Sequence, residues 1–90
     1  MALVIVRHKV KDFGIWKKGF DGHKSAQLAA GLTNPRVYRS ADDPHETVVL
    51  FDAQDIAKAK AFASSSDLKS TMQAAGVIDK PDVYFLEAAV

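Results

Sequence analysis

The sequence predicts a single α+β domain in which strands and helices follow one another in the order βαββαβ. Four short runs rich in β-branched and aromatic residues, each bounded by turn-forming residues, predict strands. Two longer segments repeat apolar residues at three- and four-residue steps, which predicts amphipathic helices. At 90 residues the chain has room for one domain, residues 1–90, and for no second one.

The first strand and the first helix are predicted in the N-terminal third of the chain. Residues 2–10 are rich in β-branched residues and too few for a helix, which is typical of a buried strand. Asp12 can cap the next element, and the apolar spacing predicts a helix over residues 13–30 that Gly31 ends. Three glycines inside this helix each cost about 1 kcal/mol relative to alanine, so we expect tertiary packing to hold it in place.

A β-hairpin is predicted in the middle of the chain. Residues 36–41 alternate between polar and apolar side chains, and residues 46–53 form a dense apolar strand. The segment between them, Asp42-Asp43-Pro44-His45, consists largely of turn-forming residues. The two strands are therefore expected to pair with each other.

The last third of the chain predicts a second helix and a final strand. Asp55 can cap the helix, and the serine-rich segment 64–67 interrupts it and caps a further helical stretch. Gly76 ends this second helix, which we expect to be split or kinked. Residues 83–88 then indicate a strand buried on both faces.

The predicted order of elements is that of a ferredoxin-like fold, a four-stranded antiparallel sheet with both helices on one face. The other face would be bare, and its side chains should be polar if it met water. Instead, both alternating sets of side chains are apolar, as in Leu3 and Val4, Val48 and Val49, or Tyr84 and Phe85. Because 48% of so short a chain is hydrophobic, we expect a homodimer in which a second copy covers the bare face by two-fold symmetry.

Composition and charge restrict the classes of partner. The formal net charge is +1, so no broad positive field is available and nucleic acid is not expected as a partner. The chain has no cysteine, which excludes disulfides, thiolate catalysis and thiolate metal sites. Its N-terminus lacks the features of a signal peptide, and its apolar run is too short to span a membrane, so we expect a cytoplasmic protein without a membrane partner.

The sequence resembles the dimeric α+β barrel superfamily along nearly its whole length. The resemblance rests on the element order and on the opening Val-Arg-His-Lys-Val, followed by Asp-Phe-Gly-Ile-Trp-Lys with Trp16 early in the helix. It also rests on Arg-Val-Tyr-Arg-Ser-Ala-Asp-Asp-Pro before the third strand. The opening is similar to the H-x-V-x-D-[FY]-x-x-W pattern of small uncharacterised bacterial members.

This superfamily includes antibiotic biosynthesis monooxygenases, polyketide cyclase-like proteins, haem-degrading enzymes and proteins without known activity. The resemblance implies a dimeric α+β barrel with a ligand cleft between the helices and the sheet of each subunit. Oxygenation of an aromatic polyketide without a cofactor is one precedent for chemistry in that cleft. The motif is specific for the fold and says little about the reaction.

Three residues of the first predicted helix form a candidate binding stripe. Trp16, Phe20 and His23 are separated by four and three residues, which places them on one face of the helix, toward the sheet. A histidine on such a face has two interpretations. It is either a core-edge residue satisfied by one hydrogen-bond partner, or a group that contacts a ligand or transfers a proton.

In the functional interpretation, His23 is a base or orienting group, Tyr38 is its polar partner from the sheet, and Trp16 is a wall of the cleft. No acidic residue occupies the sheet positions expected to face His23, so we expect a neutral imidazole. The remaining candidates for ligand contact come from the first predicted helix, the strands and the second helix: Phe20, His8, Arg36, Phe51, Tyr84 and Met72. His8 could equally lie at the rim of the dimer.

No metal or cofactor site is expected, because the histidines lack HExxH or His-x-His spacing and no glycine-rich phosphate loop occurs. Haem ligation by His23 stays open. Two functions therefore compete. The first is a cofactor-independent monooxygenase-like or cyclase-like enzyme acting on a small apolar or aromatic molecule. The second is a non-catalytic ligand-binding or structural dimer whose same residues are core. An open pocket lined by His23 and a tyrosine would favour the enzyme.

Overall fold

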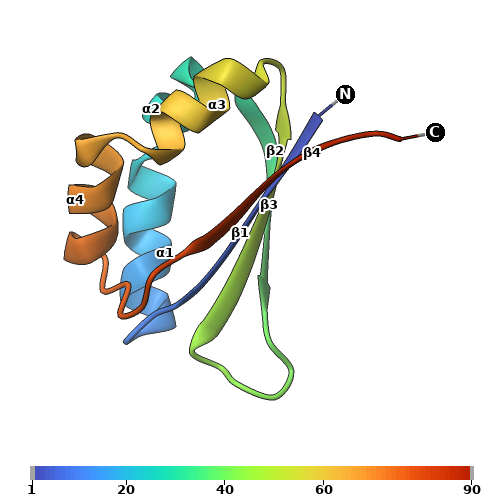
Figure 1. The fold of residues 1–90 in the computed structure, drawn as a ribbon. Helices are drawn as coiled ribbons and strands as arrows, with labels where there is room; N and C mark the ends of the chain where they lie inside the picture. Colours follow the sequence, from blue (N-terminus) through green and yellow to red (C-terminus); the bar gives the residue numbers. More distant parts are fainter. Residues whose placement is uncertain (1, 90) are drawn as a thin grey trace.

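The computed structural model describes residues 2–89, which form one antiparallel sheet covered on one face by helices (Figure 1). The predicted βαββαβ order is confirmed, with each predicted helix divided in two. The elements, in chain order, are β1 (Ala2–Lys9), α1 (Phe13–Gly22), α2 (Lys24–Ala29), β2 (Leu32–Arg39), β3 (Glu46–Ala53), α3 (Ile56–Ala63), α4 (Ser66–Ala74) and β4 (Asp82–Glu87). The sheet order is β2-β3-β1-β4, so the two central strands are β3 and β1.

The first helix differs from its prediction because it breaks at His23. The side chain of Asp12 caps α1 by accepting a hydrogen bond from the Ile15 amide, as expected. At the other end, His23 has φ −97° and ψ 11°, and its amide bonds back to the Phe20 carbonyl at 3.1 Å. Gly19 and Gly22 both precede the break, and glycine weakens a helix interior. The break leaves His23 at the junction of α1 and α2, on the side of the sheet.

The second predicted helix is divided into α3 and α4 at the serine-rich segment, as expected. Asp55 caps α3 by accepting hydrogen bonds from the Ala57 and Lys58 amides. Ser65 caps α4 in the same way through the Leu68 amide. The α4 helix ends before Gly76, whose φ of 88° is the conformation that favours glycine. The chain then returns to the sheet at β4.

Strand β2 begins four residues earlier than predicted, at Leu32. The step from Thr33 to Arg36 spans three residues, whereas the paired step from Asp52 to Leu50 on β3 spans two. This extra residue is a β-bulge, and Asn34 within it has a φ of 51°. The predicted strand began after Asn34 and Pro35, but proline is tolerated in an edge strand, and β2 is an edge strand.

The core lies between the sheet and the helices. Alternate residues of the central strands point into it, including Val4 of β1 and Val49 and Phe51 of β3, and they pack against Trp16 of α1 and Ala59 of α3. The β1–β3 register pairs Val4 with Phe51 and Val6 with Val49. This register places the same face of both central strands under the helices.

The opposite face of the sheet is apolar at its centre and uncovered in the single chain. We call it the open face, formed by Leu3, Ile5, Tyr38, Val48, Leu50, Tyr84 and Leu86. Tyr38, Tyr84 and Leu86 are among the large hydrophobic side chains left exposed. The prediction that β4 is buried on both faces is therefore wrong for one chain, because its outer face has nothing packed on it.

Between residues 2 and 89, none of the helices combines the length and the hydrophobicity that crossing a membrane requires.

Candidate functional site

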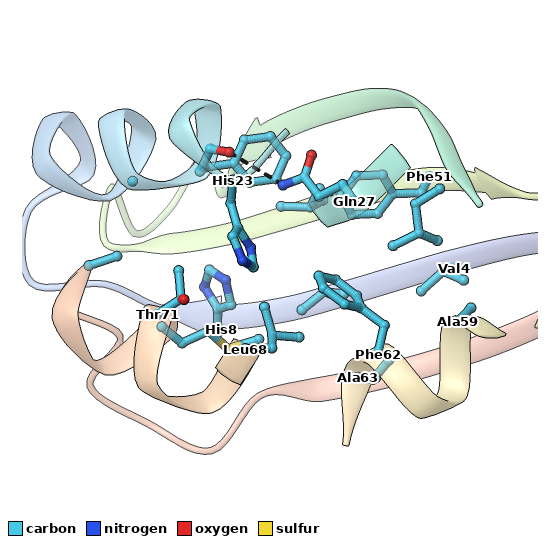
Figure 2. Close-up of a pocket in the computed structure, with 18 of the residues that line it drawn as sticks. Val4, His8, His23, Gln27, Phe51, Ala59, Phe62, Ala63, Leu68 and Thr71 are labelled. Carbon is cyan, nitrogen blue, oxygen red and sulfur yellow. Dashed lines mark hydrogen bonds between the residues drawn. The ribbon is translucent and has the colours of Figure 1, made fainter. Parts of the chain in front are cut away.

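A cavity of about 80 Å³ lies between the helices and the sheet (Figure 2). One water molecule occupies about 10–15 Å³ by the same measure, so the cavity has room for several waters or part of a small molecule. Most of its lining is apolar, and its polar groups are few: His8, His23, Gln27 and Thr71. An apolar cavity with a few converging polar groups is the usual composition of a small-molecule site.

Aromatic rings form a continuous wall along this cavity. Trp16 lies against Phe20 with ring centroids 5.1 Å apart, and Phe20 lies against Phe51 at 5.9 Å. Trp16 also contacts Phe13 at 5.8 Å. These rings come from consecutive turns of α1 and from β3, so the helix spacing identified in the sequence produces the wall. The ring pairs in this wall are tilted or stacked, and a flat apolar ligand can pack against such rings in the same way.

His8 reaches the cavity from β1, because every second residue of this strand faces the helices. Its ring meets the edge of Trp16 at 5.3 Å between centroids. Its Nδ1 atom lies 2.7 Å from the hydroxyl of Thr47, the residue paired with it across the β1–β3 ladder. Burial lowers the pKa of His8 below its ordinary value, an effect only partly opposed by a backbone hydrogen bond and by Asp79. A neutral imidazole is therefore favoured at neutral pH.

His23 reaches the cavity from the helix side and points toward His8 (Figure 2). Its side chain is 16% exposed, and its ring stacks on Phe62 with centroids 5.7 Å apart. Its Nε2 atom lies 3.6 Å from a carboxylate oxygen of Asp67, near the start of α4. The two attract each other fully only when His23 is protonated, and the side chain of Asp67 is 82% exposed, so solvent screens the pair.

Gln27 is the third polar group at the cavity. It is buried on α2, and its side-chain amide donates a hydrogen bond to the Phe20 carbonyl at 3.3 Å. That carbonyl belongs to the last turn of α1, whose helical bonding is interrupted by the break at His23. Gln27 thus stabilises the junction that positions His23.

The structure brings together most of the residues that the sequence proposed. His8, Trp16, Phe20, His23, Phe51 and Met72 all line the cavity. Of the two positions left open for His8, the structure places it in the cavity of its own chain. The prediction that His23 faces the cleft near Trp16 is confirmed.

Three proposed residues lie elsewhere. Tyr38, Tyr84 and Arg36 are on the open face of the sheet, on the side opposite the cavity. The expectation that His23 shares the cleft with Tyr38 or Tyr84 is therefore wrong. The physical reason is alternation along the strands. Val37 and Val83 pack against the core cluster, so their neighbours point away from it.

Arg36 makes an ion pair with Asp52, also on the open face, with a nitrogen to oxygen distance of 2.8 Å. Arg36 is therefore a charge paired at the sheet surface, as is usual for an arginine on a strand. Arg39 points to the other face of the sheet, where its guanidinium lies 4.5 Å from the centroid of the Phe13 ring.

Sequence reasoning missed several residues of the site. Thr47 supports His8 from β3, and its register opposite His8 could not be known before the strands were aligned. Asp67 was not predicted, because the expectation of a neutral His23 rested on the sheet positions alone, whereas this carboxylate comes from a helix. Phe62, Leu68 and Thr71 line the cavity from α3 and α4.

Across residues 2–89, no three histidine, aspartate or glutamate side chains converge in a way that could hold a metal ion. The sequence expectation that the purified protein carries neither zinc nor flavin stays a prediction, which elemental analysis and an absorption spectrum check. Stoichiometric zinc, or a flavin band that survives gel filtration, would contradict this prediction.

Comparisons with known proteins place the fold. No family model matches the chain, and no curated protein matches it in sequence. Solved structures do match over nearly the whole chain. A candidate antibiotic biosynthesis monooxygenase from Bordetella bronchiseptica superposes with a TM-score of 0.79 at 15% identity, covering 99% of this chain and 97% of that one.

Two further structures agree. A candidate antibiotic biosynthesis monooxygenase from Caulobacter crescentus CB15 gives a TM-score of 0.74 at 18% identity, covering 99% of this chain and 90% of that one. SnoaB, a cofactor-independent oxygenase from Streptomyces nogalater, gives 0.73 at 11% identity, covering 99% and 93%. The chain therefore has the ferredoxin-like fold of the antibiotic biosynthesis monooxygenase-like proteins, which confirms the resemblance at the level of the fold.

Proposed function

We propose that this protein is a homodimer in which each subunit binds a small, largely apolar aromatic molecule in the cavity and oxygenates it without a cofactor. The observation that carries the proposal is the pair His8 and His23, which face each other inside a mostly apolar, aromatic-walled cavity. The fold shared with SnoaB, a cofactor-independent oxygenase, supports the same reaction class. The alternative reaction in the same cavity is a cyclase-like one, which transfers a proton and consumes no oxygen.

The chemistry requires a base beside an apolar binding surface. A neutral imidazole removes a proton from an activated ring CH₂ or hydroxyl group, which leaves an electron-rich carbanion or phenolate. Molecular oxygen accepts the electrons and adds to the ring carbon as a peroxide anion, which takes the proton back from the imidazolium to give a hydroperoxide. Loss of water from the hydroperoxide then gives a ring carbonyl, so one oxygen atom enters the product and the other leaves as water. The aromatic wall excludes water and strengthens the electrostatic interactions inside the cavity.

The homodimer is supported by the open face. Its apolar centre is contiguous across all four strands, and exposed apolar surface of this kind commonly marks an interface. Ion pairs flank this centre, with Arg36 and Asp52 toward one end and Arg7 with three carboxylates toward the other. An apolar centre with a charged rim is the usual anatomy of a protein interface.

Oxygen uptake tests the enzymatic proposal. Purified protein is incubated with anthrone, an aromatic ketone with an activated ring CH₂, in ¹⁸O₂, and the product is analysed by mass spectrometry. We expect anthraquinone carrying one ¹⁸O atom, formed faster than in buffer and without added flavin or metal. The control is Ile15→Ala, which changes an exposed side chain of α1 outside the cavity lining and should leave the rate unchanged.

A ligand-binding function without turnover is the second candidate. It is favoured by one observation, that no tyrosine lines the cavity beside His23, although an active-site tyrosine was expected there. Saturable binding of anthrone with no product above the buffer rate would support this candidate and contradict the enzymatic one. Failure of anthrone and of other polycyclic aromatic probes to bind would contradict both.

A further inference from the structure

Thr47 and His8 form a closed hydrogen-bonded unit beneath the cavity. They are direct partners in the β1–β3 ladder, and both are almost completely buried. The Thr47 hydroxyl oxygen lies 2.7 Å from His8 Nδ1 and 3.1 Å from the His8 carbonyl oxygen. Both contacts are within hydrogen-bond distance, so one hydroxyl group serves two atoms of the same residue.

The number of hydrogens available for these two contacts favours one tautomer of His8. A threonine hydroxyl has one hydrogen to donate, and a carbonyl oxygen can only accept. When the hydroxyl donates to the carbonyl, the contact with Nδ1 is a hydrogen bond only if Nδ1 carries its own hydrogen. The neutral ring then has no hydrogen on Nε2. The opposite tautomer would leave the carbonyl contact without a hydrogen.

The other ring nitrogen of His8 is free to act on a ligand. Within residues 2–89, Nε2 of His8 makes no hydrogen bond. Every fully buried side-chain nitrogen or oxygen in that part of the chain has a hydrogen-bond partner, so Nε2 is not one of the fully buried atoms. Nε2 is therefore not sealed inside protein, and the space that His8 borders is the cavity. An unprotonated nitrogen at that position accepts a hydrogen bond or a proton.

His23 is held differently. Its ring stacks on Phe62, and its nearest charged neighbour is the exposed carboxylate of Asp67, 3.6 Å away. In the described part of the chain, no hydrogen bond fixes which of its nitrogens carries the hydrogen. His23 is thus less restricted in its tautomer than His8, although the sequence favoured it as the base.

We propose that Thr47 is a positioning residue that holds His8 as the Nδ1–H tautomer, so that Nε2 of His8 accepts the hydrogen of the bound molecule. This inference rests on the proposed function for the presence of a ligand. It also restricts the ligand class to aromatic molecules that carry a hydroxyl or an acidic C–H directed at Nε2. The charged or titratable groups around His8 are Arg7, Asp79, and His23 with Asp67 across the cavity.

The tautomer is measured by ¹⁵N NMR of the histidine rings at neutral pH, in the wild type, Thr47→Ser and Thr47→Val. We expect a protonated Nδ1 and an unprotonated Nε2 for His8 in the wild type. Thr47→Ser keeps a hydroxyl and should keep this pattern. Thr47→Val removes the acceptor of Nδ1–H and should shift His8 toward the Nε2–H tautomer.

Ligand recognition is measured with a matched pair of probes, 1-naphthol and 1-methoxynaphthalene, which differ in whether they can donate a hydrogen bond. We expect the wild type and Thr47→Ser to prefer 1-naphthol by about fivefold or more, the value of one net hydrogen bond. Thr47→Val should lose this preference. An amide NMR spectrum of each variant verifies that the fold is retained.

An Nε2–H tautomer in the wild type would overturn the proposal even if Thr47→Val did not fold. An unchanged tautomer in a folded Thr47→Val would overturn it as well, because Thr47 would then not fix the ring. If His8 has the expected tautomer but neither probe binds, the positioning role of Thr47 holds and the proposed function fails. Equal affinity for the two probes in the wild type contradicts the restriction on ligand class.

Discussion

His8 meets the edge of Trp16, with 5.3 Å between ring centroids and an interplanar angle of 70°. This contact joins the central strand β1 to the helix α1 and forms one corner of the cavity. Because Trp16 is 4% exposed and also contacts two phenylalanines, it is the most connected ring of the aromatic wall. It contributes both to stability and to the shape of the site.

Replacing Trp16 tests its contribution to stability. Trp16→Ala should lower the free energy of unfolding by about 3–5 kcal/mol, because it removes a large buried ring and leaves a cavity. Urea denaturation measures the loss. Ile15→Ala, one residue away and exposed, is the matched control and should change stability by no more than about 0.5 kcal/mol. A small effect at Trp16 would mean that its ring is not packed as the structure places it.

Stability should fall as the pH is lowered through the range in which His8 protonates in the unfolded chain. Burial lowers the folded-state pKa of His8, so below about pH 6.5 the unfolded state binds more protons than the folded state. The stabilising contribution of neutral His8 is complete above that pH and is lost below it, until the folded state is protonated too. Urea midpoints measured between pH 8 and pH 5 test this sign.

His8→Phe supplies the control for the pH series. Phenylalanine cannot titrate, so the fall in stability between neutral and mildly acidic pH should be smaller in this variant. A separate loss at lower pH should persist, because the Lys9 amide donates to Asp79 at 2.8 Å and is the main cause of the lowered pKa of that carboxyl. That contribution is present above the ordinary aspartate pKa and disappears as the pH falls through the lowered one. Identical pH profiles for wild type and His8→Phe would contradict the assignment to His8.

The proposed dimer should dissociate when a charge is placed at the centre of the open face. Ile5→Asp puts a carboxylate between Leu50 and Tyr84, which have no charge to pair with it, and we expect a folded monomer at micromolar concentration by sedimentation velocity. Leu28→Asp, which changes an exposed leucine of α2 away from the sheet face, is the control and should remain dimeric. The wild-type interface should bury at least about 1,200 Å² in total. A folded wild-type monomer at micromolar concentration would refute the homodimer.

His23 and Asp67 can be tested as a pair. His23→Ala should abolish turnover or binding of aromatic probes while leaving the fold intact, because its ring projects into the cavity. Asp67→Asn keeps the shape and removes the charge, and an exposed pair of this kind contributes about 0–1 kcal/mol at most. If His23→Ala instead lowers stability by about 1–3 kcal/mol and leaves probe binding unchanged, His23 is a core residue only.

Much of the fold could be predicted from the sequence because the signals were local. Asp12, Asp55 and Ser65 cap helices where the sequence placed caps, and each acts through hydrogen bonds within three residues. The stripe of Trp16, Phe20 and His23 was also correct, since helical spacing alone fixes which side chains share a face.

The incorrect part concerns which face each strand residue takes. Tyr38 and Tyr84 were assigned to the cavity, but each strand has large apolar side chains in both alternating sets, as in Val37 and Tyr38 or Val83 and Tyr84. The pattern therefore does not reveal which set meets the helices. Only the register with β3 and β1 decides this question. Thr47 was not predicted for the same reason. Its hydroxyl belongs to the site only because the β1–β3 register places it opposite His8, on a strand far away in the sequence.

The bulge at Asn34 and Pro35 has a consequence for how copies of this chain can meet. An edge strand with free amides and carbonyls is a template onto which another strand can add. In β2 the extra residue disrupts the ladder, and Pro35 has no amide hydrogen to offer. The β2 edge is therefore protected against the addition of further strands, which is how fibrils grow. Copies of this chain are expected to associate through another part of the sheet.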